Sequence, residues 1–402
     1  MQRRDRGVRP AAVRVLGSFG LESRFDRRRR PEAVRETPEL PPLHLQSLRA
    51  TPVVVPLRRR LATRVAVLDQ APLVLLDLET VEGVVGRAYV VAYHVDALPA
   101  FIRLFELLER RTVGARLAPA ERFDTLRREL ALLGRDGLLL MALSGFDMAA
   151  WDALARAVDS PLWRLLGPCR DRVAAYNSDD LGLDPAAALA ERVPGLLERG
   201  FRAVKLRLGR EHPSEDVAAV DAVRAALPPG RRLMVDYNQS LDAAHARERA
   251  GALDDHGLEW IEEPLPSEDH DGCRRLADAL STPIQTGENF YGPEAFAAAC
   301  AARASDLLMA DVQRVGGVTG WLRAAEHAAR AGTPLSSHLL PEFSAHLLCA
   351  TPTAHWLEYV SWAEPVLADP LRIENGDVLP AARPGAGLDW DATAVRRFRV
   401  DA

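Results

Sequence analysis

Lysine is almost absent from this chain of 402 residues. Lysine and arginine total 51, and Lys205 is the only lysine, which leaves 50 arginines. A coding bias toward arginine explains why lysine is scarce, but it does not explain which position kept one. The two residues differ where a site needs a compact point charge or a proton that can leave. The lone lysine therefore marks position 205 as a candidate reaction centre.

Cysteine and long apolar runs are also scarce. The four cysteines contain no CxxC pair, so neither a thiolate metal site nor a disulfide framework is predicted, and we expect a cytoplasmic protein. No apolar run of membrane-spanning length is expected, and no apolar segment follows the arginines of residues 1–4, so we predict no export signal and no membrane association. The net charge of −5 gives no reason to expect nucleic-acid binding.

Composition and periodicity divide the chain into four parts. Residues 1–43 are rich in arginine and proline and are typical of a flexible extension, with a binding arm or a wrongly chosen start codon as alternatives. Residues 44–168 begin with strand-like segments and continue with helical periodicity, which predicts an α+β capping domain. Residues 169–365 carry a different rhythm, and residues 366–402 are loop-rich and expected to return to the cap.

Short apolar segments alternate with alanine-rich helical patterns over residues 169–365. The intervals of about 20 to 30 residues are typical of strand–helix units in a parallel sheet. The segments are residues 173–176, 203–208, 233–237, 260–262, 284–286, 307–310 and 335–337. Seven or eight units in about 190 residues predict an α/β fold with a closed TIM-type barrel.

Each predicted strand ends near a side chain with reactive chemistry. From the third strand onward these side chains are 20 to 27 residues apart, about one strand–helix unit. Because the carboxyl ends of barrel strands share one mouth, where barrel enzymes carry out their chemistry, we expect them to converge. They are Lys205, Asp236, Glu262, Glu288, Asp311, His338 and Glu358.

Asp236, Glu262 and Glu288 contribute carboxylates from three successive strands. Any one of them alone would more often cap a helix or join a surface ion pair. Together at close range they cannot all stay ionised without a cation. All-oxygen ligands with open positions suit Mg²⁺, with Mn²⁺ as a substitute, so we predict a metal site.

Asp311 and His338 end adjacent strands. A carboxylate bonded to one imidazole nitrogen raises the basicity of the other, which makes His338 the predicted general base. Glu358 follows Trp356 in an apolar context, where a carboxyl kept protonated would donate a hydrogen bond to an oxyanion. Metal, ammonium and donor together suit removal of the proton next to a carboxylate, because they stabilise the enediolate that forms.

From about residue 48 onward the chain resembles the enolase superfamily, and within it the mandelate racemase subgroup. The resemblance implies an N-terminal cap over a modified (β/α)₇β barrel, Mg²⁺ on the three carboxylates, and a homo-oligomer. The stretches that carry it are residues 71–75 (APLVL), 147–154 (DMAAWDAL), 234–241 (MVDYNQSL), 260–264 (WIEEP), 316–321 (GGVTGW), 336–339 (SSHL) and 350–358 (ATPTAHWLE).

The same resemblance implies how a small carboxylate substrate is held. Glu358 would hydrogen-bond the substrate carboxylate. Lys205 would contact the same carboxylate, with help from Ser178. Asn238 would lie near the 2-hydroxyl group of the substrate.

One departure from the subgroup concerns the second base. His338, paired with Asp311, would be the base on one face of the substrate. The racemase of the subgroup carries Lys-x-Lys on the strand of Lys205, and its second lysine serves the opposite face, where this chain has Arg207. A guanidinium stays charged at neutral pH, so we expect one-base chemistry that dehydrates an acid sugar. Simple drift toward arginine in an ancestral racemase is the alternative.

A second departure lies in residues 56–64 (PLRRRLATR), in the place of an apolar loop that covers the phenyl ring in the racemase. Unless these arginines face solvent, they favour hydroxyls or a second carboxylate over a benzene ring. We therefore predict a Mg²⁺-dependent enzyme acting on a polar 2-hydroxy acid, an aldonate or aldarate. Racemisation or epimerisation is the second interpretation, and a catalytically idle barrel that binds a carboxylate or a partner is the third.

Overall fold

The first described residues already belong to the folded body. The computed structural model describes residues 40–401, all within one unit of the chain, Pro38–Ala402. Leu43 is buried, and its carbonyl accepts a hydrogen bond from the Leu117 N–H at 2.7 Å. Residues 1–39 of the predicted extension lie outside the described residues, and its last four residues are part of this body.

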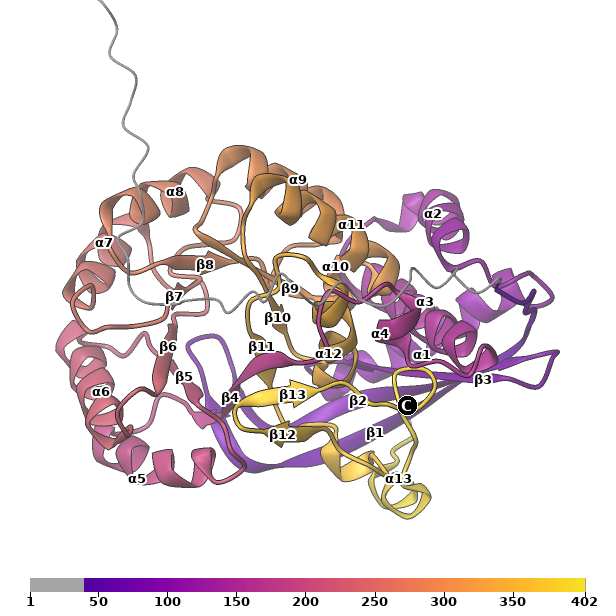
Figure 1. Cartoon of the computed structure of the whole chain (residues 1–402), viewed down its shortest axis with the longest axis horizontal. Coiled ribbons are helices and arrows are strands. Elements are labelled where there is room, and N and C mark those ends of the chain that lie inside the picture. The colour runs from indigo at the N-terminus through magenta and orange to yellow at the C-terminus, as the bar shows by residue number, and fades with distance from the viewer. Residues whose placement is uncertain (1–39, 402) are drawn as a thin grey trace, which may run out of the picture. The chain divides into compact units, whose positions relative to one another are not determined.

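Three antiparallel strands and the helices packed on them form the N-terminal domain (Figure 1). The strands pair in the order β1-β2-β3, and β1 spans 18 residues. From Ala71 onward β2 is almost wholly buried, as expected for the central strand. The elements are β1 (Leu45–Ala62), β2 (Val67–Thr80), β3 (Val85–Val91), η1 (Val95–Ala97), α1 (Leu98–Thr112), α2 (Pro119–Glu129), η2 (Ala131–Leu133), α3 (Gly137–Ala157) and α4 (Leu162–Leu165).

Helix α3 is the core of this domain. It is long and apolar enough to cross a membrane, which corrects the expectation that no segment reaches that length, but 89% of its apolar window is buried inside the protein. A Cβ on Gly86 of β3 would lie 2.1 Å from the carbonyl oxygen of Ala149. Helix α3 therefore packs directly on the backbone of β3 and occupies a core position in the domain.

Eight parallel strands, β4 to β11, form the barrel, and seven of them are followed by helices (Figure 1). Strand β11 pairs with β4, and backbone hydrogen bonds from Ser337 to Trp356 and from His355 to Leu335 join β10 to β11 and close the ring. This confirms the predicted modified TIM barrel. The strands are β4 (Val173–Leu181), β5 (Ala203–Arg207), β6 (Arg232–Asp236), β7 (Ile261–Glu262), β8 (Ile284–Thr286), β9 (Leu307–Asp311), β10 (Leu335–His338) and β11 (Leu357–Tyr359).

The barrel helices cover the outside of the strands. Apolar side chains of β5, β6 and β7 pack against α5, α6 and α7 in one buried cluster. Trp321 of α11 is also fully buried. The helices are α5 (Ala186–Leu197), α6 (Pro213–Ala226), α7 (Ala243–Ala252), α8 (His270–Ala279), α9 (Gly292–Ala302), α10 (Val312–Val315), α11 (Gly317–Ala331) and α12 (Pro341–Ala350).

The C-terminal segment touches both domains. After η3 (Glu364–Val366), the hairpin of β12 (Arg372–Glu374) and β13 (Asp377–Leu379) pairs with the start of β4. The Trp390 indole donates to Asp77 of β2 at 3.0 Å. The Val400 N–H, beyond α13 (Ala392–Phe398), donates to the carbonyl of Pro52 at 3.2 Å. The segment thus ties the cap to the barrel.

Candidate active site

The strand ends that carry the predicted chemistry lie next to one another. Parallel pairing puts Arg207 of β5 level with Asp236 of β6, and Asp236 level with Glu262 of β7. Farther round the barrel, β9 and β10 pair Asp311 with His338. Because the strands are parallel, positions one strand–helix unit apart in the sequence become neighbours at one mouth.

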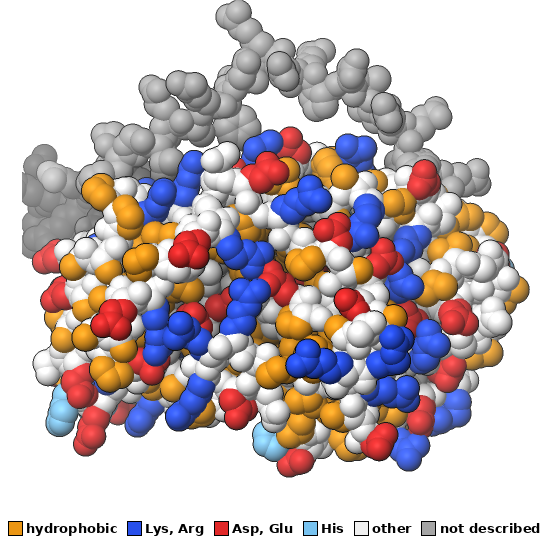
Figure 2. Space-filling model, turned by 90° about the horizontal axis from the view of Figure 1, so that it is seen from below, with side chains coloured by type: hydrophobic (Ala, Val, Ile, Leu, Met, Phe, Trp, Pro, Cys, Tyr) orange, Lys and Arg blue, Asp and Glu red, His pale blue; other side chains and the backbone are white. Residues whose placement is uncertain are grey.

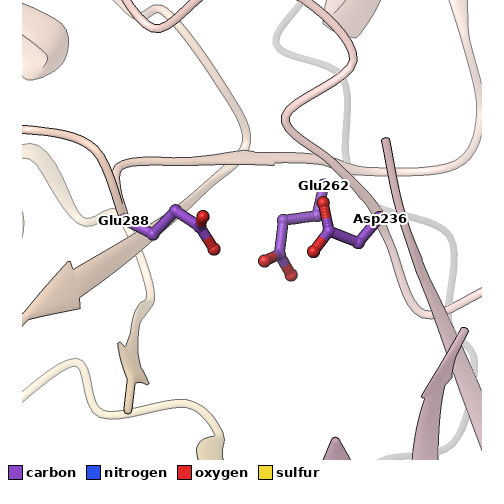
Figure 3. A group of neighbouring side chains, drawn as sticks. All are labelled: Asp236, Glu262 and Glu288. Carbon is purple, nitrogen blue, oxygen red and sulfur yellow. The ribbon is translucent and has the colours of Figure 1, made fainter. Parts of the chain in front are cut away.

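Asp236, Glu262 and Glu288 turn their carboxylates toward a common space (Figure 3). One oxygen from each lies within 4.8 Å of the others, and all three side chains are buried. Asp236 and Glu262 end β6 and β7, and Glu288 follows the end of β8 by two residues. The structure therefore brings the three predicted metal ligands together.

Neighbouring donors orient these carboxylates. The Asn238 backbone N–H and side-chain amide donate to the two oxygens of Asp236 at 2.8 and 3.0 Å. The Trp260 indole N–H donates to Glu262 at 2.9 Å. Such outer contacts fix the direction of metal ligands. Asn238, expected near the substrate 2-hydroxyl, is thus a hydrogen-bond partner of the predicted metal ligand Asp236.

The donor set fits Mg²⁺, which prefers oxygen ligands. Burial raises the pKa of Asp236 and raises that of Glu262 well above its usual range, and neighbouring carboxylates add to both shifts. Burial opposes ionisation of Glu288 as well, but the positive charges of His338 and Lys205 lower its pKa. A divalent cation among these oxygens would offset the repulsion between buried negative charges.

Lys205 lies inside this group of carboxylates and is 0% exposed. Its Nζ is 2.6 Å from Glu262 Oε1, 2.8 Å from Glu358 Oε1 and 3.4 Å from Asp236 Oδ2. Burial works against its charge, but these carboxylates raise the pKa of Lys205 well above its usual range. Since it is the only lysine, every blue side chain on the surface in Figure 2 is an arginine.

Arg207 faces the same mouth as Lys205, as the strand alternation predicts. Its Nη1 donates to the Ser178 hydroxyl at 2.8 Å and to the Ser178 carbonyl at 3.1 Å. Its guanidinium lies 3.8 Å from Asp236 and 3.9 Å from Glu358. Burial opposes its charge, yet these carboxylates raise the pKa of Arg207. Arg207 is a fixed cation and not a proton acceptor.

Glu358 is an acceptor in this site. The Ser178 hydroxyl donates to its Oε1 at 2.7 Å. Burial acts to raise the pKa of Glu358, but Lys205, His338 and Arg207 together hold it well below its usual range. The expectation of a protonated Glu358 is therefore wrong, because the surrounding cations outweigh its apolar setting.

Asp311 and His338 form the predicted pair, with His338 Nδ1 at 2.8 Å from Asp311 Oδ2. The other ring nitrogen, Nε2, lies 3.4 Å from Glu288 and 3.8 Å from Glu358. Burial works against a charged ring, but the surrounding carboxylates, Glu288 foremost, raise the pKa of His338. Nε2 is therefore the ring nitrogen that faces the predicted metal ligand Glu288.

Sequence reasoning misses several polar groups behind the site. The Tyr93 hydroxyl, from the cap, donates to Asp311 at 3.2 Å across a separation of 218 residues. Arg314 donates to the side chain of Asn289, which in turn donates to Glu263 at 2.6 Å. Burial raises the pKa of Glu263 to about 8. Glu263 stands in the WIEEP stretch, but nothing in the sequence marks Tyr93.

The arginines of residues 56–64 do not support a polar substrate. Arg58 pairs with Glu364 at 2.9 Å and Arg59 with Asp180 at 3.4 Å. These two arginines line a cavity of about 500 Å³ together with residues of β4 and α5. The other two arginines of the segment are exposed. Ion pairs with acidic residues of the barrel or exposure to solvent therefore explain the positions of all four arginines.

Two family models match the chain. Residues 47–167 match the model described as mandelate racemase / muconate lactonizing enzyme, N-terminal domain. Residues 187–394 match the model described as enolase C-terminal domain-like. The two matches cover the cap and most of the barrel.

Similar proteins cover between 66% and 90% of this chain. An L-talarate/galactarate dehydratase of Salmonella typhimurium is 35% identical over 66% of this chain and 67% of its own length. A solved enolase from alpha proteobacterium bal199 with bound magnesium is 44% identical, covering 89% of this chain and 100% of that one, with a TM-score of 0.87. A Bradyrhizobium enolase complexed with magnesium and mandelic acid is 40% identical, covering 90% of this chain and 100% of that one, with a TM-score of 0.86.

Proposed function

The chain belongs to the mandelate racemase / muconate lactonizing enzyme family of the enolase superfamily, and on this premise we propose that it dehydrates an acid sugar. It is an enzyme of that superfamily with Mg²⁺ as its cofactor. The proposed substrate is an aldonate or an aldarate, and talarate and galactarate, which the dehydratase relative is named for, are aldarates. The reaction begins with removal of the proton on carbon 2.

The observation that carries this proposal is the chemical difference between His338 and Arg207, the two residues expected on opposite faces of the substrate. On one face, His338 holds Nδ1 at 2.8 Å from Asp311 and presents Nε2 as a base. On the other face, Arg207 is a buried guanidinium fixed by Ser178. A guanidinium cannot take a carbon-bound proton at neutral pH. One face can accept a proton and the other cannot.

Residues of this chain also stabilise the charge that develops. Asp236, Glu262 and Glu288 would hold the magnesium ion, which when bound supplies positive charge next to the substrate carboxylate. Lys205 adds a second buried positive charge, since its ammonium lies between Glu262 and Glu358. In a buried setting these charges act more strongly than in water.

Elimination follows from the same histidine. His338 Nε2 takes the carbon-2 proton, the carbon 3–oxygen bond breaks, and the protonated ring gives its proton to the departing hydroxyl. Water leaves and the carbon 2–carbon 3 enol remains, which becomes the 2-keto-3-deoxy acid on tautomerisation. His338, on one face of the substrate, can therefore carry out both the proton removal and the proton delivery.

Racemisation or epimerisation of a 2-hydroxy acid is the second candidate. It is favoured by the mandelic acid bound to the Bradyrhizobium enolase. It is also compatible with residues 56–64, because the ion pairs of Arg58 and Arg59 leave no evidence that this segment selects a polar substrate. This reaction needs a proton delivered to the face of Arg207, by water or another group. The geometry of Arg207 makes it the weaker proposal.

Two broader proposals accompany the reaction. The four cysteines are free thiols, which supports a reducing compartment such as the cytoplasm.

A homo-oligomer is proposed from the family resemblance alone, and analytical ultracentrifugation of the purified chain tests it. A single monomeric species would contradict it.

A product assay across a panel of acids tests the reaction. We expect the magnesium-loaded enzyme to form a 2-keto acid from at least one aldonate or aldarate, detected as its semicarbazone. Mandelate enantiomers in the same panel test racemisation by polarimetry. Racemised mandelate without any keto acid would contradict the dehydration proposal.

His338→Asn is the matched control for this assay, because it removes the base while keeping a polar side chain. We expect the keto acid to disappear while Mg²⁺ binding, followed by calorimetry, persists. If the native chain shows no turnover and binds no Mg²⁺, the catalytically idle barrel is favoured instead.

A further inference from the structure

Tyr93 has an unusual backbone for its residue type. It follows strand β3 with φ +60°, in the left-handed region that a bulky side chain rarely adopts. Such strain is kept where the surrounding structure holds a side chain in place for function. The conformation carries the Tyr93 side chain from the cap to the end of β9, where its hydroxyl meets Asp311 at 3.2 Å.

The direction of the Tyr93 hydroxyl proton is determined by its other partner. The Gln313 side-chain N–H donates to the Tyr93 oxygen at 3.1 Å. The Gln313 amide cannot be reversed without loss, because its oxygen accepts from the Val91 N–H at 2.9 Å. Since the phenol has one proton and already accepts from Gln313, that proton points to Asp311.

The carboxylate of Asp311 is fully engaged. Its Oδ1 accepts from the backbone N–H groups of Gln313 and Arg314 at 2.8 and 3.2 Å, at the start of α10. Its Oδ2 meets His338 Nδ1 at 2.8 Å and the Tyr93 hydroxyl at 3.2 Å. Tyr93 is the contact that comes from the cap, and the other three come from the barrel.

We propose that Tyr93 is a positioning residue for proton transfer. Its hydroxyl holds Asp311 in the orientation that fixes the His338 ring and directs Nε2 to the substrate. The inference rests on the proposed role of His338 as the base. It also gives the cap a part in the chemistry, because the catalytic pair is complete only when the cap sits on the barrel.

Arg314 holds the ring of Tyr93 in place. Its guanidinium carbon lies 5.0 Å from the centre of that ring, within cation–π range. The same guanidinium donates to the carbonyl of Glu288 at 2.9 Å. One partly buried cation therefore connects Tyr93 to Glu288, a predicted metal ligand. The contact with Arg314 can therefore keep the ring in place when the hydroxyl is removed.

Tyr93→Phe tests the proposal because it keeps the ring and removes only the hydroxyl. With the acid that the native enzyme turns over best, we expect kcat to fall by about 10- to 100-fold, by analogy with the loss of a hydrogen bond that orients a metal-binding side chain. KM should change by less than about threefold, because a group bonded to Asp311 does not hold the substrate. A raised KM with unchanged kcat would overturn the proposal.

Tyr89→Phe is the matched control. Tyr89 lies on β3 of the cap, and its hydroxyl donates to the buried Glu342 of the barrel at 2.5 Å. The variant loses the same kind of phenol–carboxylate contact, but not one with Asp311. We expect it to lower the melting temperature with kcat within twofold of the native value. Equal losses of kcat in both variants would reduce Tyr93 to a structural contact and overturn the proposal.

A spectroscopic readout does not depend on turnover. In the magnesium-loaded full chain labelled with ¹⁵N-histidine, the His338 Nδ1–H signal is assigned by its loss in His338→Asn. We expect this signal to shift or broaden in Tyr93→Phe and to stay unchanged in Tyr89→Phe. An unchanged signal in Tyr93→Phe would overturn the inference even if the dehydration proposal holds. A shifted signal would support it even if no acid is dehydrated.

Discussion

At the scale of single residues, Lys205 and Arg207 are two cations that lie two positions apart on β5 and make different contacts. Lys205 is wholly buried among three carboxylates at 2.6 to 3.4 Å. Arg207 extends past them to Ser178, where its planar group makes two hydrogen bonds. A compact ammonium fits the first place and a forked guanidinium the second.

Lys205→Arg is expected to abolish turnover although it preserves charge. The larger planar group does not fit where Nζ lies 2.6 Å from Glu262 and 2.8 Å from Glu358. We expect a loss in kcat of at least ~10²–10³-fold, as for removal of an oxyanion stabiliser. Steady-state kinetics check this, with exposed Arg202→Lys as the control, and substantial activity in Lys205→Arg would contradict the assigned role.

Arg207→Lys is expected to open the second face to proton exchange. A lysine here can lose its proton more readily than arginine, and it lies near Asp236 and Glu358 at the mouth. We expect exchange of the α-proton in the opposite configuration to rise at least ~10-fold above the native background, which is less than the ~10²–10⁴-fold that a well-placed acid–base group contributes. Proton NMR in D₂O measures it. No gain would show that Arg207 is not what limits the native enzyme to one face.

At the scale of elements, the β1–β2 hairpin of the cap is fastened to the loop after β4. The Leu183 N–H donates to the carbonyl of Ala62 at 2.8 Å. A Cβ on Gly182 would lie 2.7 Å from that carbonyl oxygen and 2.9 Å from the Ala62 nitrogen. The hairpin backbone therefore lies directly against the barrel loop, with no room for a side chain between them.

Gly182→Ala is expected to push the hairpin away from the barrel. Overpacking of this kind costs about 1–3 kcal/mol in the free energy of unfolding. We also expect kcat/KM to fall, because the hairpin lies beside the mouth. Gly195→Ala on α5 is the control, since a Cβ there meets nothing within 4 Å. Similar thermal denaturation and kinetics for the two variants would contradict the proposed contact.

The strand ends of the barrel were predictable because one repeat governs them. Each βα unit returns the chain to the same mouth, so spacings of 20 to 27 residues translate into contacts such as Asp236 with Glu262. The contacts between cap and barrel follow no repeat. The bond of Tyr93 to Asp311 and the pairing of Arg58 with Glu364 depend on how two domains pack, which local patterns do not encode.

The charge state of Glu358 illustrates a second limit. The apolar residues before it predict a protonated carboxyl, and burial does act in that direction. Lys205 and Arg207 of β5 and His338 of β10 reverse the shift. A pKa depends on every charge within a few ångströms, and those charges are known only once the barrel closes.

At the scale of the whole molecule, buried histidines make stability depend on pH. Burial lowers the pKa of His346 to about 3 and that of His355 to about 4, against 6.5 ordinarily. As pH falls from about 6.5 toward these values, the unfolded chain takes up protons that the folded chain does not. The contribution of each histidine to stability therefore decreases in this window, by at most about 1.4 kcal/mol per pH unit, whereas a buried carboxyl with a raised pKa, such as Glu263, acts in the opposite direction.

His346→Gln is expected to weaken this dependence. Melting temperatures of the variant and the native chain between pH 6.5 and 4 should converge as the pH falls, because glutamine does not titrate. His327→Gln, at a partly exposed position on α11, is the control and should follow the native curve. Parallel curves for His346→Gln and the native chain would refute the assignment.

The fate of the α-proton in D₂O tests the central claim most directly. The enzyme is incubated with Mg²⁺ and each of two acids that differ only in configuration at carbon 2, and proton NMR follows the carbon-2 signal. One-base chemistry through His338 predicts that one acid exchanges or is dehydrated while the other keeps its proton and its configuration. Exchange of both acids with inversion would contradict the claim and identify a racemase.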